Sequence, residues 1–162
     1  IMVTTSESLA NAVSDEVERQ LKLLPRESIA RPAIENNSYI AVMDSIEDMF
    51  TVMNEVAPEH LEIQLPDPMN YMSLVQNAGS VFLGAYASEP LGDYLGGTNH
   101  VLPTSGTARF SSPLGVYDFV KRTSFTQFTK ERLEEVAKHI TTLARTEGLE
   151  AHARAIEVRF EK

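Results

Sequence analysis

The alternation of short apolar stretches with amphipathic helical patterns most constrains what this chain can fold into. Strand-like stretches lie at residues 1–5, 39–43, 61–63 and 80–83. Between them, apolar residues recur every three or four positions, as they do on the buried face of a helix. Helices between strands bring the chain back to the same end of a sheet, so the strands run parallel. The sequence therefore predicts an α/β fold with a mostly parallel sheet.

Capping residues set the bounds of the predicted helices. Ser6 is a good N-cap for the first helix, which Pro25 closes. Asp44 or Ser45 can cap the second helix, and Pro68 can start a third over residues 69–76. The resulting layer resembles an incomplete Rossmann-like sheet that extends to about Leu114.

The second half of the chain has a different character. Residues 84–114 hold five glycines and three prolines, and a loop of that length is more often functional than idle. Phe125–Phe128 is predicted as a strand, Thr129 caps a helix that ends near Gly148, and a last helix covers residues 149–159. We therefore expect two parts, residues 1–114 and a small C-terminal piece with two helices at 115–162.

Composition excludes several classes of function. The 162 residues carry a formal net charge of −9, which repels phosphate groups and makes nucleic acid and anionic membranes poor partners. Because there is no cysteine, any metal must be held by His, Asp, Glu, Asn or Gln. We expect no membrane-spanning segment, no signal peptide and a cytoplasmic protein. The chain opens directly in a predicted strand, which suggests that an N-terminal part has been cut away.

Three groups of residues in the first part could carry chemistry. Glu59 and His60 are adjacent, so the carboxylate could activate a water while the imidazole exchanges protons, although such pairs also occur in solvated turns. Asp93 follows a glycine, where it could bind zinc or simply hydrogen-bond its own backbone. His100 ends a glycine-rich run and could be a ligand, a substrate contact or a stabilising group of the loop.

A fourth group lies near the predicted break between the last two helices. Glu147 precedes Gly148, and His152 shares a helix face with Ile156. A histidine on a half-apolar face is more often structural than a metal ligand. His139, on the flank of the preceding helix, is interpreted as structural.

Taken together, four segments closely resemble the histidinol dehydrogenase family in order and spacing, and the resemblance covers essentially the whole chain. They are Ala57-Pro58-Glu59-His60-Leu61-Glu62; Gly92-Asp93-Tyr94 with Gly97-Thr98-Asn99-His100-Val101-Leu102-Pro103-Thr104; Ala108-Arg109-Phe110-Ser111; and Glu147-Gly148-Leu149-Glu150-Ala151-His152. The resemblance implies oxidation of L-histidinol to L-histidine through histidinaldehyde, with two NAD and a zinc ion.

The resemblance also implies roles for individual residues. Glu59 and His60 match the catalytic acid/base pair, and Asp93 and His152 match two zinc ligands. Glu147 matches a carboxylate that binds the substrate's amino group. His60, Asp93 and His152 also line the substrate pocket, and His100 matches a histidine close to it. Residues 1–114 would then belong to the catalytic domain, and residues 115–162 would form a piece that completes the neighbour's site in a homodimer.

The family's chain is much longer than this one. A glutamine and a histidine that complete the zinc site lie upstream of the matched region, as does most of the NAD site. We therefore expect a fragment that is inactive when isolated. The rival hypotheses are a dehydrogenase of another small alcohol such as a sulfonated diol, a non-catalytic dimerisation or binding domain, and a zinc hydrolase built on Glu59, His60 and Asp93.

Overall fold

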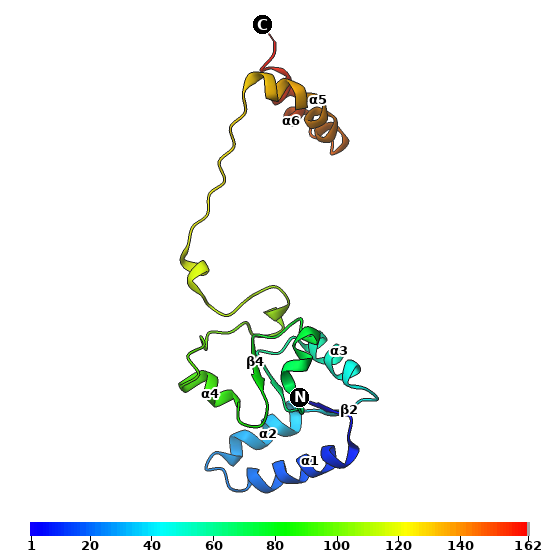
Figure 1. Ribbon diagram of the computed structural model, residues 1–162, viewed down its shortest axis with the longest axis vertical. Coiled ribbons are helices and arrows are strands. Elements are labelled where there is room, and N and C mark those ends of the chain that lie inside the picture. Colours follow the sequence, from blue (N-terminus) through cyan, green and yellow to red (C-terminus); the bar gives the residue numbers. More distant parts are fainter. Residues whose placement is uncertain (162) are drawn as a thin grey trace. The chain divides into compact units, whose positions relative to one another are not determined.

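The computed structural model describes residues 1–161, which fold as two compact units (Figure 1). The first unit spans Ile1–Val120 and the second begins at Lys121. The sequence places the boundary a few residues earlier, after Leu114. None of the helices in the described part of the chain is long and apolar enough to cross a bilayer.

The first unit begins with two parallel strands and a pair of helices. β1 (Met2–Thr4) pairs with β2 (Ile40–Val42), with Met2 opposite Ile40. α1 (Glu7–Leu21) and α2 (Glu27–Asn37) connect them (Figure 1). The Ser6 hydroxyl accepts a hydrogen bond from the Leu9 N–H at 3.2 Å, so it caps α1 as predicted.

A second parallel pair carries the larger core. β3 (His60–Ile63) pairs with β4 (Ser80–Leu83), with His60 opposite Ser80. α3 (Ile46–Val56), capped by Ser45, precedes β3, and the 3-10 helix η1 (Pro68–Leu74) joins the two strands. Phe50 of α3 packs with Leu61 and Ile63 to form the buried cluster. The predicted α/β fold with parallel strands is therefore confirmed, as two short sheets.

Short helices follow β4. α4 (Glu89–Tyr94) and η2 (Thr107–Arg109) interrupt the stretch that the sequence predicts as loop, and η3 (Val116–Phe119) follows that stretch. Arg109 fixes part of it by donating hydrogen bonds to the carbonyl oxygens of Gly106, at 2.9 Å, and of Glu55. The prediction of a structureless loop over residues 84–114 is thus wrong in detail.

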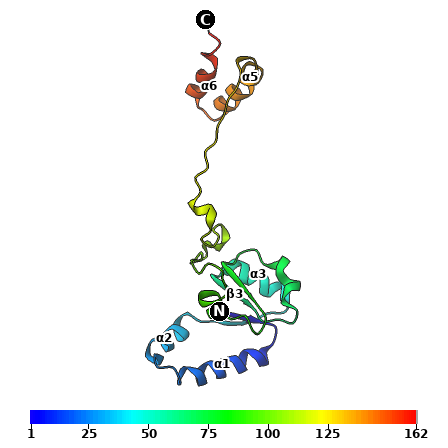
Figure 2. The same cartoon turned by 60° about the vertical axis from the view of Figure 1, so that its left-hand side comes forward.

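The second unit is a helical hairpin. α5 (Lys130–Thr146) and α6 (Glu150–Glu157) lie side by side in both views (Figures 1 and 2). Thr129 caps α5 by accepting the Arg132 N–H at 3.2 Å. Gly148 adopts φ +76° between the helices, a conformation that favours glycine. Ala144 and Ala153 are buried where the helices meet, since small side chains allow close packing.

Three local predictions are wrong. Residues Phe125–Phe128 form no strand: Phe125 is 93% exposed, and no strand of the described residues pairs with this segment. The segment after Pro68 is a 3-10 helix instead of an α-helix. No predicted element corresponds to α2, which contains Pro32 and buries none of its residues.

Candidate functional site

The Glu59–His60 pair stands where α3 turns into β3. Ala57, 1% exposed, ends α3 with φ +50° and directs the chain into the strand. The N–H of Ser80 donates to the Glu59 carbonyl oxygen at 2.8 Å, and Gly79 donates to Pro58 at 2.9 Å. A Cβ on Gly79 would lie only 2.6 Å from the Glu59 carbonyl oxygen, so glycine allows this close approach. The backbone of the pair is therefore fixed by the neighbouring strand.

His60 is the centre of the candidate site. Its ring tilts against Phe82, with ring centroids 6.0 Å apart. Its Nε2 atom is buried without a hydrogen-bond partner among the described residues, and the nearest carboxylate oxygen, of Glu89, is 3.8 Å away. Because burying a polar atom without a partner is costly, such an atom indicates a position for a ligand or metal ion.

Two carboxylates of α4 converge on the same point. One ligand atom each from His60, Glu89 and Asp93 lies within 4.8 Å of the other two. Glu89 and Asp93 are four residues apart, so they share one face of the short helix. Imidazole and carboxylate groups are ligands that zinc accepts, so the cluster fits a metal ion.

Two contacts position α4 over the sheet. The Glu62 carboxylate accepts the Glu89 N–H at 3.0 Å, which fixes the start of the helix. Gly92 lies against the Phe82 ring, and a Cβ at Gly92 would come within 2.8 Å of two ring carbons. The distance between His60 and Asp93 therefore depends on a glycine and on the strand residues Glu62 and Phe82.

His100 is not part of this cluster. It is exposed, in a segment that the side chain of Asn99 holds in place. The Asn99 side-chain amide donates a hydrogen bond to the Leu114 carbonyl oxygen at 2.7 Å, and its side-chain oxygen accepts one from the Val101 N–H at 2.8 Å. Asn99 thus shapes the loop on which His100 stands. The role of His100 stays a prediction.

Glu147 and His152 belong to the second unit, and both are exposed: Glu147 ends α5, and His152 lies in the first turn of α6. Arg145 binds Glu150 at 2.8 Å and Glu157 at 2.9 Å, and so connects the end of α5 to α6. The hydrogen bond from Arg145 lowers the pKa of the Glu150 carboxyl group, which therefore stays ionised. These ion pairs and Gly148 set the geometry of the turn that presents Glu147 and His152.

Glu89 is the site residue that the sequence analysis misses. Its i, i+4 spacing to Asp93 could have revealed it, but only if residues 89–94 had been predicted as a helix. Two glycines within eight residues, Gly92 and Gly96, and Pro90 make that helix hard to predict.

Comparison with known proteins gives one consistent result. The sequence model of the family described as histidinol dehydrogenase matches residues 1–160. The chain is 67% identical over 161 residues to the histidinol dehydrogenase of Lactiplantibacillus plantarum, covering 99% of this chain and 38% of that protein. It is 59% identical over 162 residues to that of Streptococcus mutans, covering 100% of this chain and 38% of that protein.

A solved structure agrees. The crystal structure of histidinol dehydrogenase from Elizabethkingia anophelis is similar, with 40% sequence identity and a TM-score of 0.75, over 98% of this chain and 36% of that one. The chain therefore spans about 38% of the length of the curated relatives that it matches. With a family match along residues 1–160 and relatives of such high identity, the chain belongs to the histidinol dehydrogenase family.

Proposed function

We propose that these residues form part of the active site of a cytoplasmic, homodimeric enzyme that oxidises L-histidinol to L-histidine, as a step of histidine biosynthesis. The observation that carries the proposal is the buried, unpartnered Nε2 of His60 beside Glu89 and Asp93. Family membership supports the reaction, because the curated relatives are named for it. NAD⁺ would accept the hydride in each of the two oxidations.

In the first oxidation, we assign His60 the role of the base. It takes the proton of the histidinol hydroxyl group as a hydride leaves the carbon that bears this group, so the alcohol becomes an aldehyde. Glu89, 3.8 Å from Nε2, would stabilise the imidazolium that forms. The proton then passes to solvent and leaves His60 ready for the second oxidation.

The second oxidation needs water. Glu59 would take a proton from a water that adds to histidinaldehyde and return a proton to the former carbonyl oxygen, which gives a hydrate with two hydroxyl groups. His60 would again take a hydroxyl proton as the second hydride leaves, and the product is the carboxylic acid. The hydrogen bonds from Gly79 and Ser80 fix the backbone of this segment, which supports the assignment of roles that need fixed positions.

The metal would be shared between the two subunits of the homodimer, as the resemblance to the family implies. We assign Asp93 and His152 as zinc ligands, with further ligands from polypeptide outside these residues. Bound zinc would orient the substrate through its imidazole and amino nitrogens. Glu147 would bind the amino group and His100 would lie at the edge of the site. The acidic net charge of −9 supports a protein that binds no nucleic acid.

A substrate panel tests this function. The full-length enzyme should reduce NAD⁺ with histidinol and with histidinaldehyde, and much more slowly with small alcohols that lack an amino group, such as a sulfonated diol. If the enzyme oxidised such a diol faster than histidinol, the rival hypothesis of a dehydrogenase that acts on another small alcohol would be favoured. The cluster of His60, Glu89 and Asp93 would also serve a zinc hydrolase, which would act without NAD⁺.

The 162-residue chain alone should bind zinc weakly, with a Kd above about 1 μM, because it supplies only two of the expected ligands. Complete structural zinc sites bind the ion with a free energy of about 10–16 kcal/mol. Isothermal titration calorimetry with Zn²⁺ measures this Kd. His139→Asn, which changes an exposed histidine outside the cluster, is the control for non-specific binding. Tight stoichiometric binding that disappears in His60→Asn would contradict this assignment and indicate a self-contained site with Glu89 and Asp93.

Gly92→Ala should damage the site without changing any polar group. The new Cβ would meet two Phe82 ring carbons at 2.8 Å, so α4 must shift and carry Asp93 away from His60. A displacement of about 1 Å can cost about 100-fold in rate. Measured kcat/KM and zinc content of the full-length enzyme should both fall. Gly115→Ala is the matched control, since its Cβ would meet nothing closer than 3.8 Å, and equal activity of the two variants would refute the argument.

A further inference from the structure

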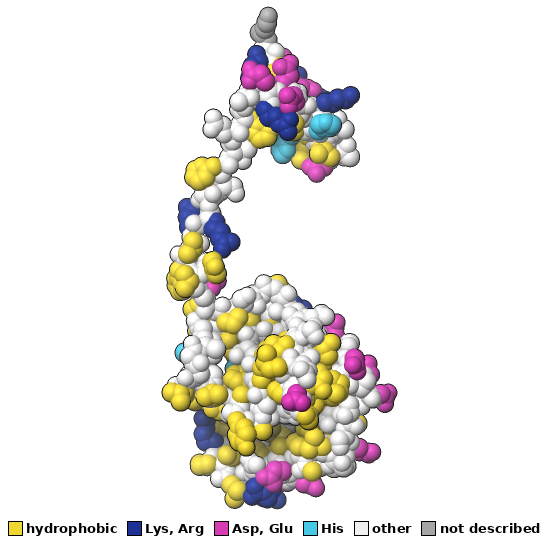
Figure 3. Space-filling model, in the orientation of Figure 1, with side chains coloured by type: hydrophobic (Ala, Val, Ile, Leu, Met, Phe, Trp, Pro, Cys, Tyr) yellow, Lys and Arg dark blue, Asp and Glu magenta, His cyan; other side chains and the backbone are white. Residues whose placement is uncertain are grey.

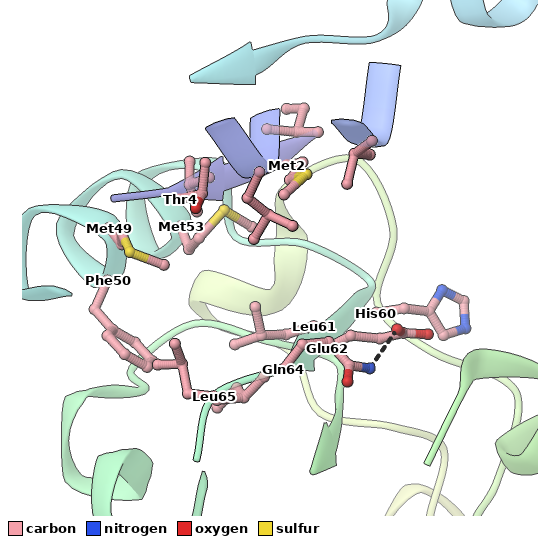
Figure 4. A pocket seen from close by; sticks show the side chains of 15 residues that line it. Met2, Thr4, Met49, Phe50, Met53, His60, Leu61, Glu62, Gln64 and Leu65 are labelled. Carbon is pink, nitrogen blue, oxygen red and sulfur yellow. Dashed lines mark hydrogen bonds between the residues drawn. The ribbon is translucent and has the colours of Figure 1, made fainter. Parts of the chain in front are cut away.

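Asn54 is a polar residue on the side of α3 that faces the core. It lies four residues after Phe50, so the two side chains project from the same face of the helix. Phe50 is buried and packs against Leu61 of β3 (Figure 4). A polar group at such a position is costly unless it finds hydrogen-bond partners. The partners of Asn54 therefore indicate what this residue does.

The side chain of Asn54 has hydrogen-bond partners for both of its polar atoms. Its Oδ1 atom accepts the N–H groups of Gln76 and Asn77, at 2.8 and 3.1 Å. Its Nδ2 atom donates to the Leu74 carbonyl oxygen at 2.8 Å. In addition, the Asn77 side-chain amide donates to the backbone carbonyl oxygen of Asn54 at 3.0 Å. These hydrogen bonds join α3 to the segment between η1 and β4.

The hydrogen bonds of Asn54 close a ring of chain that contains the Glu59–His60 pair. On one side of this ring, α3 ends shortly after Asn54 and leads directly into the pair. On the other side, the segment held by Asn54 leads into β4, whose first N–H, that of Ser80, donates to the Glu59 carbonyl oxygen at 2.8 Å. The pair is thus held between two stretches of chain, and Asn54 ties these stretches together.

Asparagine suits this position better than other residues of its size. Aspartate could accept both N–H groups, but it could not donate to the Leu74 carbonyl oxygen. It would also add negative charge to a chain of net charge −9, whose first unit shows acidic side chains on the face in Figure 3. Leucine would leave the two N–H groups and the Leu74 carbonyl oxygen without this partner, which costs free energy where they are shielded from water. The position thus requires a side chain that both donates and accepts.

We propose that Asn54 is a positioning residue for the acid/base pair, which it fixes relative to the substrate through the segment before β4. The inference rests on the proposed function, because it takes Glu59 and His60 as the groups that transfer protons. Asn54 acts on the backbone of the pair, at the carbonyl oxygens that Gly79 and Ser80 bind. Proton transfer requires the base to lie within hydrogen-bond reach of the substrate, so a small displacement of this backbone lowers kcat.

Kinetics of the full-length enzyme test the proposal. Asn54→Leu should lower the kcat of both half-reactions by about 10- to 100-fold, because a displacement of about 1 Å can cost about 100-fold in rate. The KM for histidinol and the zinc content should stay at the wild-type values, since the assigned ligands Asp93 and His152 lie outside the ring. Asn54→Asp keeps the acceptor for both N–H groups and should lose less activity. Leu21→Val, at a buried position of α1, is the control for stability alone: its Tm should fall while its kcat is unchanged.

Hydrogen exchange with residue-level fragmentation gives a second result that does not depend on activity. The amides of Gly79 and Ser80 should exchange at least about 10-fold faster in Asn54→Leu than in the wild-type full-length enzyme, because the segment that leads into them is no longer held. In Leu21→Val their exchange should be unchanged. If Asn54→Leu does not fold, Asn77→Ala, which removes a single hydrogen bond to Asn54, supplies the same comparison with smaller changes.

The outcomes separate this inference from the proposed function. If Asn54→Leu keeps the kcat of the wild-type enzyme, or if the Gly79 and Ser80 amides stay protected in it, Asn54 only stabilises the fold and the inference is overturned. Equal losses of activity in Asn54→Asp and Asn54→Leu would overturn it as well, since the two accepted N–H groups would then have no effect on the pair. A wild-type enzyme that does not oxidise histidinol would instead refute the proposed function, and faster exchange in Asn54→Leu would still show that Asn54 holds this backbone.

Discussion

Replacement of His60 by Asn in the full-length enzyme is expected to abolish both half-reactions, with losses of about 100- to 10,000-fold in kcat. Asparagine keeps a polar side chain of similar reach, but it cannot take up a proton near neutral pH. Since both oxidations begin with removal of a hydroxyl proton, both rates should fall together. The half-reactions are measured separately by supplying histidinol or histidinaldehyde with NAD⁺.

Glu59→Gln should separate the two halves. Only the step from aldehyde to acid consumes water, so the loss of a carboxylate that activates water should slow histidinaldehyde oxidation far more than histidinol oxidation. Glu55→Gln is a suitable control, because Glu55 is an exposed carboxylate on the preceding helix, outside the cluster. Equal losses in both halves for Glu59→Gln would remove its assignment as the group that activates water.

The elements of the fold that could be predicted from the sequence are those with strong local signals. β1, β2 and β4 are short, mainly apolar runs, and β3 alternates polar with apolar residues. α1, α3 and α5 each begin at a Ser or Thr whose hydroxyl group accepts a backbone N–H. These signals depend only on neighbouring residues, so they are visible without knowledge of tertiary contacts. The pairing of β1 with β2 follows because two helices return the chain to a parallel position.

α2 could not be predicted in the same way. It buries none of its residues, so it has no apolar stripe with helical spacing, and Pro32 suggests a break. Ion pairs from Arg31 to Glu18 and Glu27 accompany the helix in the fold. The contact to Glu18 reaches back to α1, and a contact of this kind is not apparent from local sequence.

For the candidate site as well, the sequence predicts the residues that stand in a local motif and not those brought in by tertiary contacts. Glu59, His60 and Asp93 are recognised by motif, since each stands in a segment that resembles the family. Glu89 is not, because its place beside His60 arises from the folding of α4 onto β3 and β4, through Glu62, Phe82 and Gly92. Local sequence thus predicts which residues carry chemistry, whereas the convergence of two carboxylates on one imidazole is a tertiary property.

Mixing two inactive variants of the full-length enzyme, His60→Asn and His152→Asn, should restore about a quarter of the wild-type activity. The resemblance to the family implies that the C-terminal piece of one subunit completes the site of its partner. His60 stands in the first compact unit and His152 in the second, so the two defects would then fall in the same site of a mixed dimer. One site of that dimer carries both defects, and the other carries neither.

The expected magnitude follows from symmetry. Random exchange of subunits gives about half mixed dimers, each with one intact site of two, so about a quarter of the activity returns if the sites act independently. A mixture of His60→Asn with Asp93→Asn is the matched control, because both residues belong to the same compact unit and every site of the mixed dimer then keeps one defect. If the mixture of His60→Asn with His152→Asn stays as inactive as that control, with exchange verified by differently tagged subunits, each site is built within one subunit. The family assignment would stand, and the proposed sharing of zinc ligands between subunits would not.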